Sequence, residues 1–212
     1  MHNVIPGLYA SEPESLGRLG SGASLQIRAF LLRREGGNLL VYRSASLEQD
    51  VEAVRDLGGV WRQYLNHRHE ASPACDWVAG TFGAPLHVHR EDAGAASEVC
   101  GVAATFSGRH RVGEDFEVIP IPGHTDGATA FLWSTGEHRV LFPGDTIFFG
   151  EGGVGDRRKY VQSLELLRSL DFDLVVPGIT VEGEPYHWFV EKTEAERRID
   201  GLIEQVRRGG GG

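Results

Sequence analysis

The sequence is poor in cysteine, and neither of its cysteines lies in a recognisable metal or redox motif. The 212 residues contain only Cys75 and Cys100, both outside any CxxC or CxxH pair. A small scaffold held together by several disulfides is therefore excluded. We expect both thiols to act as small buried hydrophobic groups in a reducing cytosol, rather than as a disulfide or as metal ligands.

Long apolar runs and an excess of positive charge are also missing. No segment approaches the roughly 18 apolar residues of a membrane-spanning helix. The first ten residues lack the basic and apolar regions of a signal peptide. The formal net charge of −9 does not provide the basic footprint that binding to a nucleic-acid backbone requires. We therefore expect a cytoplasmic protein that acts on a small-molecule substrate, with neither nucleic acid nor membrane as a partner.

The sequence contains enough hydrophobic residues to form one hydrophobic core. Hydrophobic residues make up 41% of the chain, and 29 glycines indicate many tight turns. No low-complexity stretch or linker divides the chain, so we predict a single domain over residues 1–212. Within it, residues 1–25 are expected to form a lead-in, and residues 208–212 are expected to form a disordered tail.

Apolar periodicity predicts strands in groups, with helices between and after them. In the first half we predict a hairpin, a helix capped by Ser46 with Gln49, a strand, a helix and a strand, over residues 29–44, 46–59, 60–66, 74–83 and 85–89. In the second half we predict a strand, a hairpin, an amphipathic helix, a buried strand and a C-terminal helix, over residues 116–123, 128–144, 159–171, 172–178 and 193–208. This order favours an α+β fold whose packed sheets carry helices on their outer faces.

Four short segments at predicted strand ends carry the chemistry of the chain. They read LNHRHEAS, IPGHTDGA, LFPGDT and VVPGIT, at residues 65–72, 121–128, 141–146 and 175–180. His67 and His69 lie two apart, so on an extended strand end both imidazoles face the same way. His124 and Asp145 each follow a glycine after another strand, where a rigid sheet can bring loop residues together.

Three imidazoles and one carboxylate predict a nitrogen-rich site for one divalent metal. Zinc suits this ligand set best, although two of the histidines with Asp145 could instead form the facial triad of a ferrous site. Four other histidines are interpreted as structural, a pair inside a predicted strand and two residues in surface loops or turns: His87, His89, His110 and His138. His187, in a late loop, is interpreted in the same way, with the alternative that it reaches back toward the site.

In their order and flanking residues, these segments resemble the metallo-β-lactamase superfamily over roughly residues 28–180. The first motif of that family usually reads His-x-His-x-Asp-His, whereas this chain has Ala71 and Ser72 at the Asp and third His positions. Ile179 stands where the family has its last histidine. The resemblance implies a four-layer αβ/βα sandwich with the metal site at one edge, between the two sheets.

The departures from the family motif fall on the ligands of one of two metals. The resemblance implies that the family usually activates water between two metals, with the residue at Asp145 bridging them. Here it implies a single metal held by His67, His69, His124 and Asp145. Asp145 is the candidate catalytic residue, because Ala71 cannot accept a proton. We expect Glu70 to point away from the site on an extended chain and to be a poor replacement ligand.

Three functions are compatible with this ligand set. The favoured one is a single-metal hydrolase that uses metal-activated water on an ester, a thioester or an amide of a small molecule. A second is a mononuclear iron oxygenase, which would resemble the sulfur dioxygenases of the family. A third is a catalytically degenerate member that binds a metal, a ligand or a partner, because three ligand positions are lost together.

Overall fold

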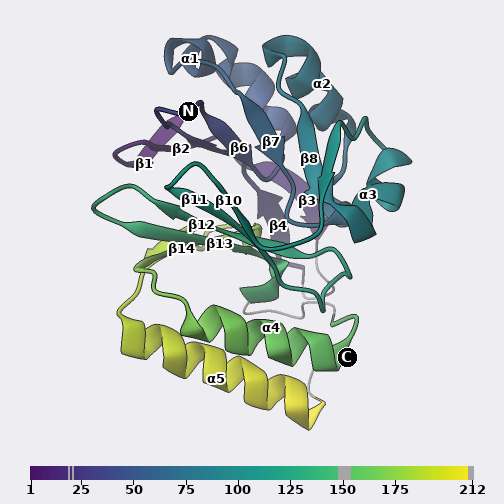
Figure 1. Ribbon diagram of the computed structural model, residues 1–212, viewed down its shortest axis with the longest axis vertical. Coiled ribbons are helices and arrows are strands. Elements are labelled where there is room, and N and C mark those ends of the chain that lie inside the picture. Colours follow the sequence, from purple (N-terminus) through teal and green to yellow (C-terminus); the bar gives the residue numbers. More distant parts are fainter. Residues whose placement is uncertain (19, 21, 148–153, 210–212) are drawn as a thin grey trace.

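The chain folds into four layers, with two sheets in the middle and helices on both outer faces (Figure 1). The computed structural model describes residues 1–18, 20, 22–147 and 154–209. Three helices cover the first sheet: α1 (Val51–Asp56), α2 (Pro73–Phe82) and α3 (Arg90–Ser97). Two long helices, α4 (Arg157–Ser169) and α5 (Lys192–Arg208), cover the second sheet. The predicted α+β, four-layer αβ/βα sandwich is confirmed.

The first sheet has seven strands in the order β1-β2-β5-β6-β7-β8-β9. Its middle strands are parallel to one another and its early strands are antiparallel. The bounds are β1 (His2–Ile5), β2 (Leu8–Ala10), β5 (Phe30–Leu32), β6 (Leu39–Val41), β7 (Arg62–Tyr64), β8 (Leu86–His89) and β9 (Ala104–Phe106). Strand β7 lies inside the sheet between β6 and β8, and its carboxyl end leads directly to the first histidine motif.

The second sheet has six strands in the order β10-β11-β12-β13-β14-β16. The predicted hairpin is β12 paired antiparallel with β13, and the predicted buried strand β14 lies parallel to β13. The bounds are β10 (His110–Val112), β11 (Phe116–Pro120), β12 (Thr129–Ser134), β13 (Arg139–Gly144), β14 (Leu174–Pro177) and β16 (Trp188–Phe189). Strands β11 and β13 both run antiparallel to β12, which lies between them, so they end at the same edge of the sheet and the loops that follow them lie at that edge.

A third sheet of three short strands involves the N-terminal segment. Strands β3 (Glu14–Arg18) and β4 (Ser24–Ile27) pair with each other, and β4 pairs with β15 (Ile179–Val181). The segment expected to be a lead-in thus contributes strands to two sheets. Of the predicted tail, residues 210–212 lie outside the described residues, and Arg208 is the last residue of α5.

The core lies between the sheets and is rich in aromatic side chains. Phe30 packs edge-on against Tyr42 and Phe142, with ring centroids about 6 Å apart. Helix α4 buries Tyr160, Leu164 and Leu167 against the outer face of the second sheet, as its apolar spacing predicted. Burial on both faces of each sheet explains why the strands read as apolar runs with little alternation.

The prediction of a helix cap at Ser46 was wrong, whereas the prediction that both cysteines are buried is confirmed. Ser46 does not cap a helix: Ser44 does, because its side chain accepts from the Ser46 amide at the start of a 3₁₀ turn that precedes α1. Cys75 and Cys100 are both buried free thiols, in one apolar cluster beneath α2. None of the helices in the described part of the chain combines the length and apolar character needed to cross a bilayer.

Candidate metal centre

The first histidine motif leaves strand β7 and turns sharply. His67 has an extended backbone (φ −159°, ψ 170°), and Arg68–Glu70 form a single 3₁₀ turn. The prediction that both histidines lie on an extended strand end was therefore wrong, because His69 lies in this turn. The turn nevertheless brings the rings together, because the His67 and His69 centroids lie 5.0 Å apart at nearly right angles.

His124 joins this pair from the loop after β11. Its ring centroid lies 4.6 Å from that of His67 and 5.2 Å from that of His69. His69 Nδ1 and His124 Nε2 are 3.2 Å apart. One nitrogen from each of the three rings lies within 4.8 Å of the other two, which makes them a possible metal-ligating group among the described residues.

Asp145 begins a short 3₁₀ turn directly after β13 and faces the same point. Its Oδ2 lies 3.5 Å from His67 Nε2 and 3.9 Å from His124 Nε2. Its Oδ1 lies against the backbone of Gly178, where a Cβ would come within 2.7 Å of that oxygen. Glycine at position 178 therefore leaves room for the Asp145 carboxylate, which a larger residue would displace.

Burial sets the protonation state that these histidines prefer. His67 is 3% exposed, and burial lowers its pKa to about 4. Burial and the neighbouring His67 and His124 rings lower the pKa of His69 to about 4 as well. Burial also raises the pKa of Asp145, against the opposing effect of His67. Neutral imidazoles are the form in which histidine binds a metal.

Two buried ligand-type atoms at the centre lack hydrogen-bond partners among the described residues. One is His67 Nε2, which faces Asp145 Oδ2, and the other is Asp145 Oδ1, the carboxylate oxygen that lies against Gly178. Buried polar atoms are almost always satisfied, so two such atoms beside three converging imidazoles indicate a site for a cation. The donor set of nitrogen and carboxylate oxygen fits a divalent transition metal such as zinc.

Behind the histidines lie two polar residues whose roles the sequence did not reveal. Asn66 Oδ1 is 2.8 Å from His67 Nδ1. Glu70 is 3% exposed, accepts from the Asn66 amide at 3.0 Å, and has its other oxygen 3.5 Å from His67 Nδ1. Burial raises the pKa of Glu70 to about 8. Glu70 therefore lies behind His67 rather than pointing away from it, because the chain turns at 68–70 instead of staying extended.

Asp92 of α3 holds the two histidine loops together. This carboxylate is 1% exposed and accepts from the Arg68 amide at 2.9 Å and from the Thr125 hydroxyl at 2.6 Å. Its other oxygen accepts from the Gly127 amide at 3.2 Å. Arg68 lies between His67 and His69, and Thr125 follows His124. One buried carboxylate thus fixes the relative position of the ligand loops.

The three positions that depart from the family motif lie on separate elements. Ala71 follows the 3₁₀ turn, and Ser72 is the N-cap residue of α2 without a side-chain capping hydrogen bond. Ser72 Oγ is buried and makes no hydrogen bond. Ile179 is the first residue of β15 and pairs with Ile27. None of these three side chains is a ligand of the kind the family uses for its second metal.

The other histidines lie outside the three-histidine cluster. His87 and His89 belong to β8 as predicted, and His89 Nδ1 accepts from the Glu91 amide at the start of α3. His138 lies in a turn and pairs with Asp173 at 2.8 Å. His110 begins strand β10, rather than lying in a loop. His187 lies beside Tyr186, with ring centroids 4.8 Å apart.

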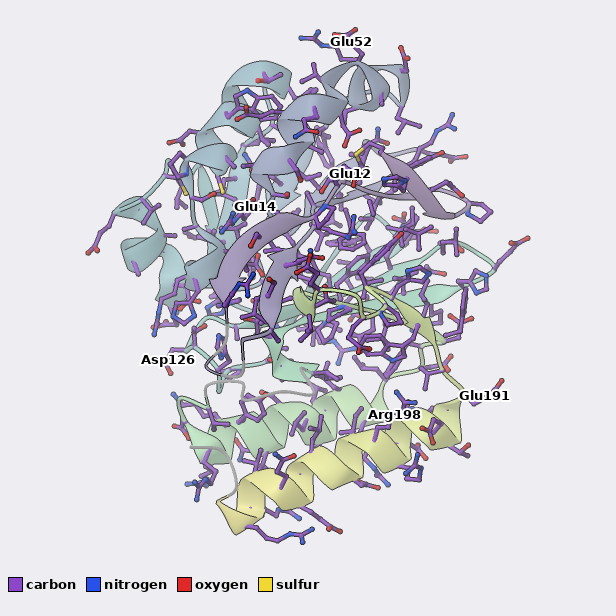
Figure 2. The ribbon with its side chains drawn as sticks, turned by 180° about the vertical axis from the view of Figure 1, so that it is seen from behind. Glu12, Glu14, Glu52, Asp126, Glu191 and Arg198 are labelled. Carbon is purple, nitrogen blue, oxygen red and sulfur yellow. The ribbon has the colours of Figure 1, made fainter. Side chains whose placement is uncertain are left out.

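Lys159 and Tyr160 lie in the first turn of α4, close to the His124 loop. Lys159 Nζ pairs with Asp126 at 2.7 Å (Figure 2 shows Asp126 on the loop above the start of this helix). Tyr160 is buried and donates to the Thr146 carbonyl. A Cβ at Gly123 would overlap the Tyr160 backbone. Both residues therefore anchor the helix against the ligand loops.

Comparison with known proteins finds sequence similarity over part of this chain and similarity of fold over nearly all of it. The model of the metallo-beta-lactamase superfamily matches residues 76–179, a span that contains His124, Asp145 and Ile179 and begins after His69. A hydroxyacylglutathione hydrolase from Prochlorococcus marinus (strain MIT 9301) is 38% identical over 68 residues, which are 31% of this chain. The match spans only about a quarter of that relative, 27% of its length.

Solved structures share the fold over nearly the whole chain. A metallo-beta-lactamase from Pontibacter korlensis superposes with a TM-score of 0.72 at 14% identity, covering 97% of both chains. A metallo-beta-lactamase family protein from Thermus thermophilus gives 0.69 at 17% identity, covering 97% of this chain and 81% of its own. A metallo-beta-lactamase from Elizabethkingia meningoseptica gives 0.64 at 16% identity, covering 98% and 96%. At these identities the likeness concerns the fold.

Proposed function

This chain belongs to the metallo-β-lactamase superfamily, and from that premise we propose that it is a metal-dependent hydrolase with a single-metal site. The observation that carries the proposal is the convergence of His67, His69 and His124, whose ligand atoms lie within 4.8 Å of one another. Asp145 faces the same point, with Oδ2 3.5 Å from His67 Nε2. Ala71, Ser72 and Ile179 stand where the family carries the ligands of its second metal, so these positions would offer a second ion no imidazole or carboxylate.

The residues of the centre divide into two roles. The three imidazoles, with Asp145 as the fourth ligand, would hold the metal, and zinc is the best fit to this ligand set. When bound, zinc supplies a Lewis acid that polarises a carbonyl and brings the pKa of a water ligand to about 7. Asp145 is the carboxylate on the metal-facing side of the histidines, so it would orient the water and accept its proton. Glu70 lies on the far side of His67 and would not contact the reacting atoms.

An activated acyl group is the substrate class that fits such a centre. A Lewis acid and a nearby carboxylate suit the attack of water on an ester, a thioester or an amide of a small molecule. The name of the Prochlorococcus relative describes hydrolysis of an acylated glutathione, which favours a thioester within this class. Because that relative matches over only 68 residues, the substrate is proposed as a class rather than as one compound.

The deciding experiment is elemental analysis of wild type and His69→Ala, purified without chelator or metal-affinity resin. We expect about one zinc per chain in wild type and a clear loss in the variant. The zinc-loaded protein is then tested on a panel of esters, thioesters and lactams, with His69→Ala as the matched inactive control. Turnover in wild type that is lost in the variant would support the hydrolase.

Two other outcomes would replace this proposal. Iron as the main metal, with oxygen uptake on thiol or persulfide substrates, would favour the mononuclear oxygenase. Absence of any metal from wild type would contradict the metal site and point to a degenerate member that binds a ligand or partner. If the wild-type protein bound metal but turned over no substrate of the panel, the hydrolase would be contradicted, whereas the metal site would still be supported.

A further inference from the structure

Asn66 occupies the position between strand β7 and the first ligand. It is 1% exposed, and its Oδ1 lies 2.8 Å from His67 Nδ1. Its Nδ2 donates to the Thr129 carbonyl. A carbonyl can only accept, so the amide nitrogen must face Thr129 and the amide oxygen must face His67. His67 Nδ1 is therefore the protonated nitrogen, and it donates to Asn66.

This hydrogen bond determines what the other nitrogen can do. A neutral imidazole has one donor and one acceptor nitrogen, so protonation at Nδ1 leaves a lone pair on Nε2. His67 Nε2 is buried and has no hydrogen-bond partner in the described part of the chain, and it lies 3.5 Å from Asp145 Oδ2. The lone pair thus points to the centre of the proposed site before any metal arrives.

The Asn66 side chain is held so that it cannot turn over. Its backbone amide donates to Glu70 Oε2 at 3.0 Å, and its backbone carbonyl accepts from Thr129 at 2.9 Å. On the other side, a Cβ at Gly144 would overlap its carboxamide. Contacts from the ligand turn, from β12 and from the end of β13 therefore fix one orientation.

A second acceptor lies within reach of His67 Nδ1 but does not hold it. Glu70 Oε1 is 3.5 Å away, whereas Asn66 Oδ1 is at 2.8 Å, and Glu70 Oε1 makes no hydrogen bond to any residue that the structure describes. Without the Asn66 oxygen, the ring would be able to turn toward Glu70 or to carry its proton on Nε2. Either change would direct the lone pair away from the site.

Resting on the proposed metal site, we propose that Asn66 is a positioning residue that fixes the tautomer and orientation of His67 for metal binding. It contacts neither metal nor substrate, and it acts through His67. Glu70 supports it by accepting from its backbone. Partners of this kind commonly change metal affinity about 10- to 100-fold when they are lost.

The test combines three variants with two measurements, and a fourth variant serves to assign the spectrum. Asn66→Leu removes the acceptor, and Asn66→Asp keeps an acceptor oxygen at the same place. Asn38→Leu is the matched control: Asn38 is also buried, accepts from Arg34, and donates to the Leu57 and Gly59 carbonyls. The Zn²⁺ dissociation constant is measured by chelator competition. The His67 tautomer is measured in metal-free protein by long-range ¹⁵N–¹H correlation, with His67→Gln for assignment.

We expect metal-free wild type to carry the His67 proton on Nδ1. Asn66→Leu should weaken Zn²⁺ binding about 10- to 100-fold. Asn66→Asp should weaken it less, because an acceptor for His67 remains although the second carboxylate oxygen faces the Thr129 carbonyl. Asn38→Leu should lose stability without changing the constant. A proton on Nε2 in wild type would overturn the proposal, as would wild-type Zn²⁺ affinity in a folded Asn66→Leu. If wild type bound no Zn²⁺, the proposed function would fail, and the tautomer would still decide the role of Asn66.

Discussion

The carboxylate of Asp92 accepts a hydrogen bond from the Thr125 hydroxyl at 2.6 Å, which joins helix α3 to the loop that carries His124. The same oxygen accepts from the Arg68 amide at 2.9 Å, in the turn between the first two ligands. A buried carboxylate with charge-assisted hydrogen bonds to two loops is a stiff connection in a low-dielectric environment. The geometry of the centre therefore depends on a residue that does not face it.

Asp92→Asn should destabilise the protein and weaken Zn²⁺ binding together. Every group around the Asp92 carboxylate is a donor, so the amide nitrogen of Asn would face a donor and leave it unpaired. We expect a loss of about 2–4 kcal/mol in the free energy of unfolding. Chemical denaturation measures this loss, and chelator competition measures the affinity.

Asp173→Asn is the control for Asp92→Asn. Asp173 also joins two groups, the Arg139 amide and His138, but its side chain is 46% exposed and lies beside the β12–β13 hairpin. We expect a loss of at most about 1 kcal/mol and unchanged Zn²⁺ affinity. Equal behaviour of the two variants would mean that Asp92 is an ordinary surface-type contact and not a connection between the ligand loops.

The side chains that converge at the candidate centre could be predicted from the sequence, whereas the residues that hold them in place could not. His67, His69, His124 and Asp145 follow strands in motifs of recognisable order, and a motif is local information. Asp92 is 24 residues from Arg68 and 33 from Thr125 along the chain, so its role exists only once α3 has packed against both loops. A single buried acidic residue in a helix gives no pattern that distinguishes it from a solvated one.

Gly144→Ala should damage both the fold and the centre. Gly144 has φ +58°, and a Cβ there would overlap the Asn66 carboxamide. The left-handed backbone costs about 1–2 kcal/mol with a side chain, and the overlap adds about 1–3 kcal/mol. We expect a lower melting temperature and weaker Zn²⁺ binding, because Asn66 is displaced from His67.

The control for Gly144→Ala is Gly83→Ala. Gly83 has φ +68° at the end of α2, and no atom lies within 4 Å of an added Cβ. The free energy of unfolding of this variant should fall by only the cost of the left-handed backbone, about 1–2 kcal/mol. Its Zn²⁺ affinity should equal that of wild type. An equal loss of stability in Gly144→Ala and Gly83→Ala would mean that the Asn66 side chain moves away from the added Cβ without cost. Gly144 would then not hold Asn66 in place.

His87 should make the protein less stable as the pH falls from about 6.5 to 4. Burial lowers its pKa to about 4, helped by Arg62 and His110, while the unfolded chain keeps a value near 6.5. Between these values the unfolded state binds more protons, so stability is full above about pH 6.5 and declines toward pH 4. His87 is only half-buried, so the contribution is on the order of 1 kcal/mol.

His87→Phe isolates this contribution and keeps an aromatic ring on Tyr64, against which His87 stacks at 5.0 Å. Free energies of unfolding are measured for wild type and variant across the acidic range, each relative to its own value at neutral pH. The wild-type curve should fall more steeply than that of the variant. Parallel curves would mean that His87 titrates alike in the folded and unfolded chain.

The N-terminal segment shows a second limit of the sequence. Its strands are short, and they pair with partners far along the chain, as β4 does with β15 through Ile27 and Ile179. Strand propensity over three to five residues is weak, and the pairing that stabilises it is not local. The long amphipathic helices α4 and α5, in contrast, repeat their apolar positions over many turns and were predicted near their observed bounds.

Restoring the three missing ligands should give the chain a second metal. The triple variant Ala71→Asp, Ser72→His, Ile179→His places the family residues at the positions from which they are absent. Two features favour its folding. The Ser72 side chain makes no capping hydrogen bond to α2, so no cap is lost, and Ile179 is only half-buried at the start of its strand. Elemental analysis should change from about one zinc per chain to about two.

The single variant Ile179→His is the control for this gain, because one added imidazole with Asp145 provides too few ligands for a second ion. It should keep about one zinc per chain. The comparison separates two explanations of the one-metal site. A second zinc in the triple variant alone would mean that the backbone still frames both positions and that only side chains were lost. One zinc in a folded triple variant would mean that the loops after β7 and β14 no longer approach closely enough, so the single-metal state would be fixed by the backbone.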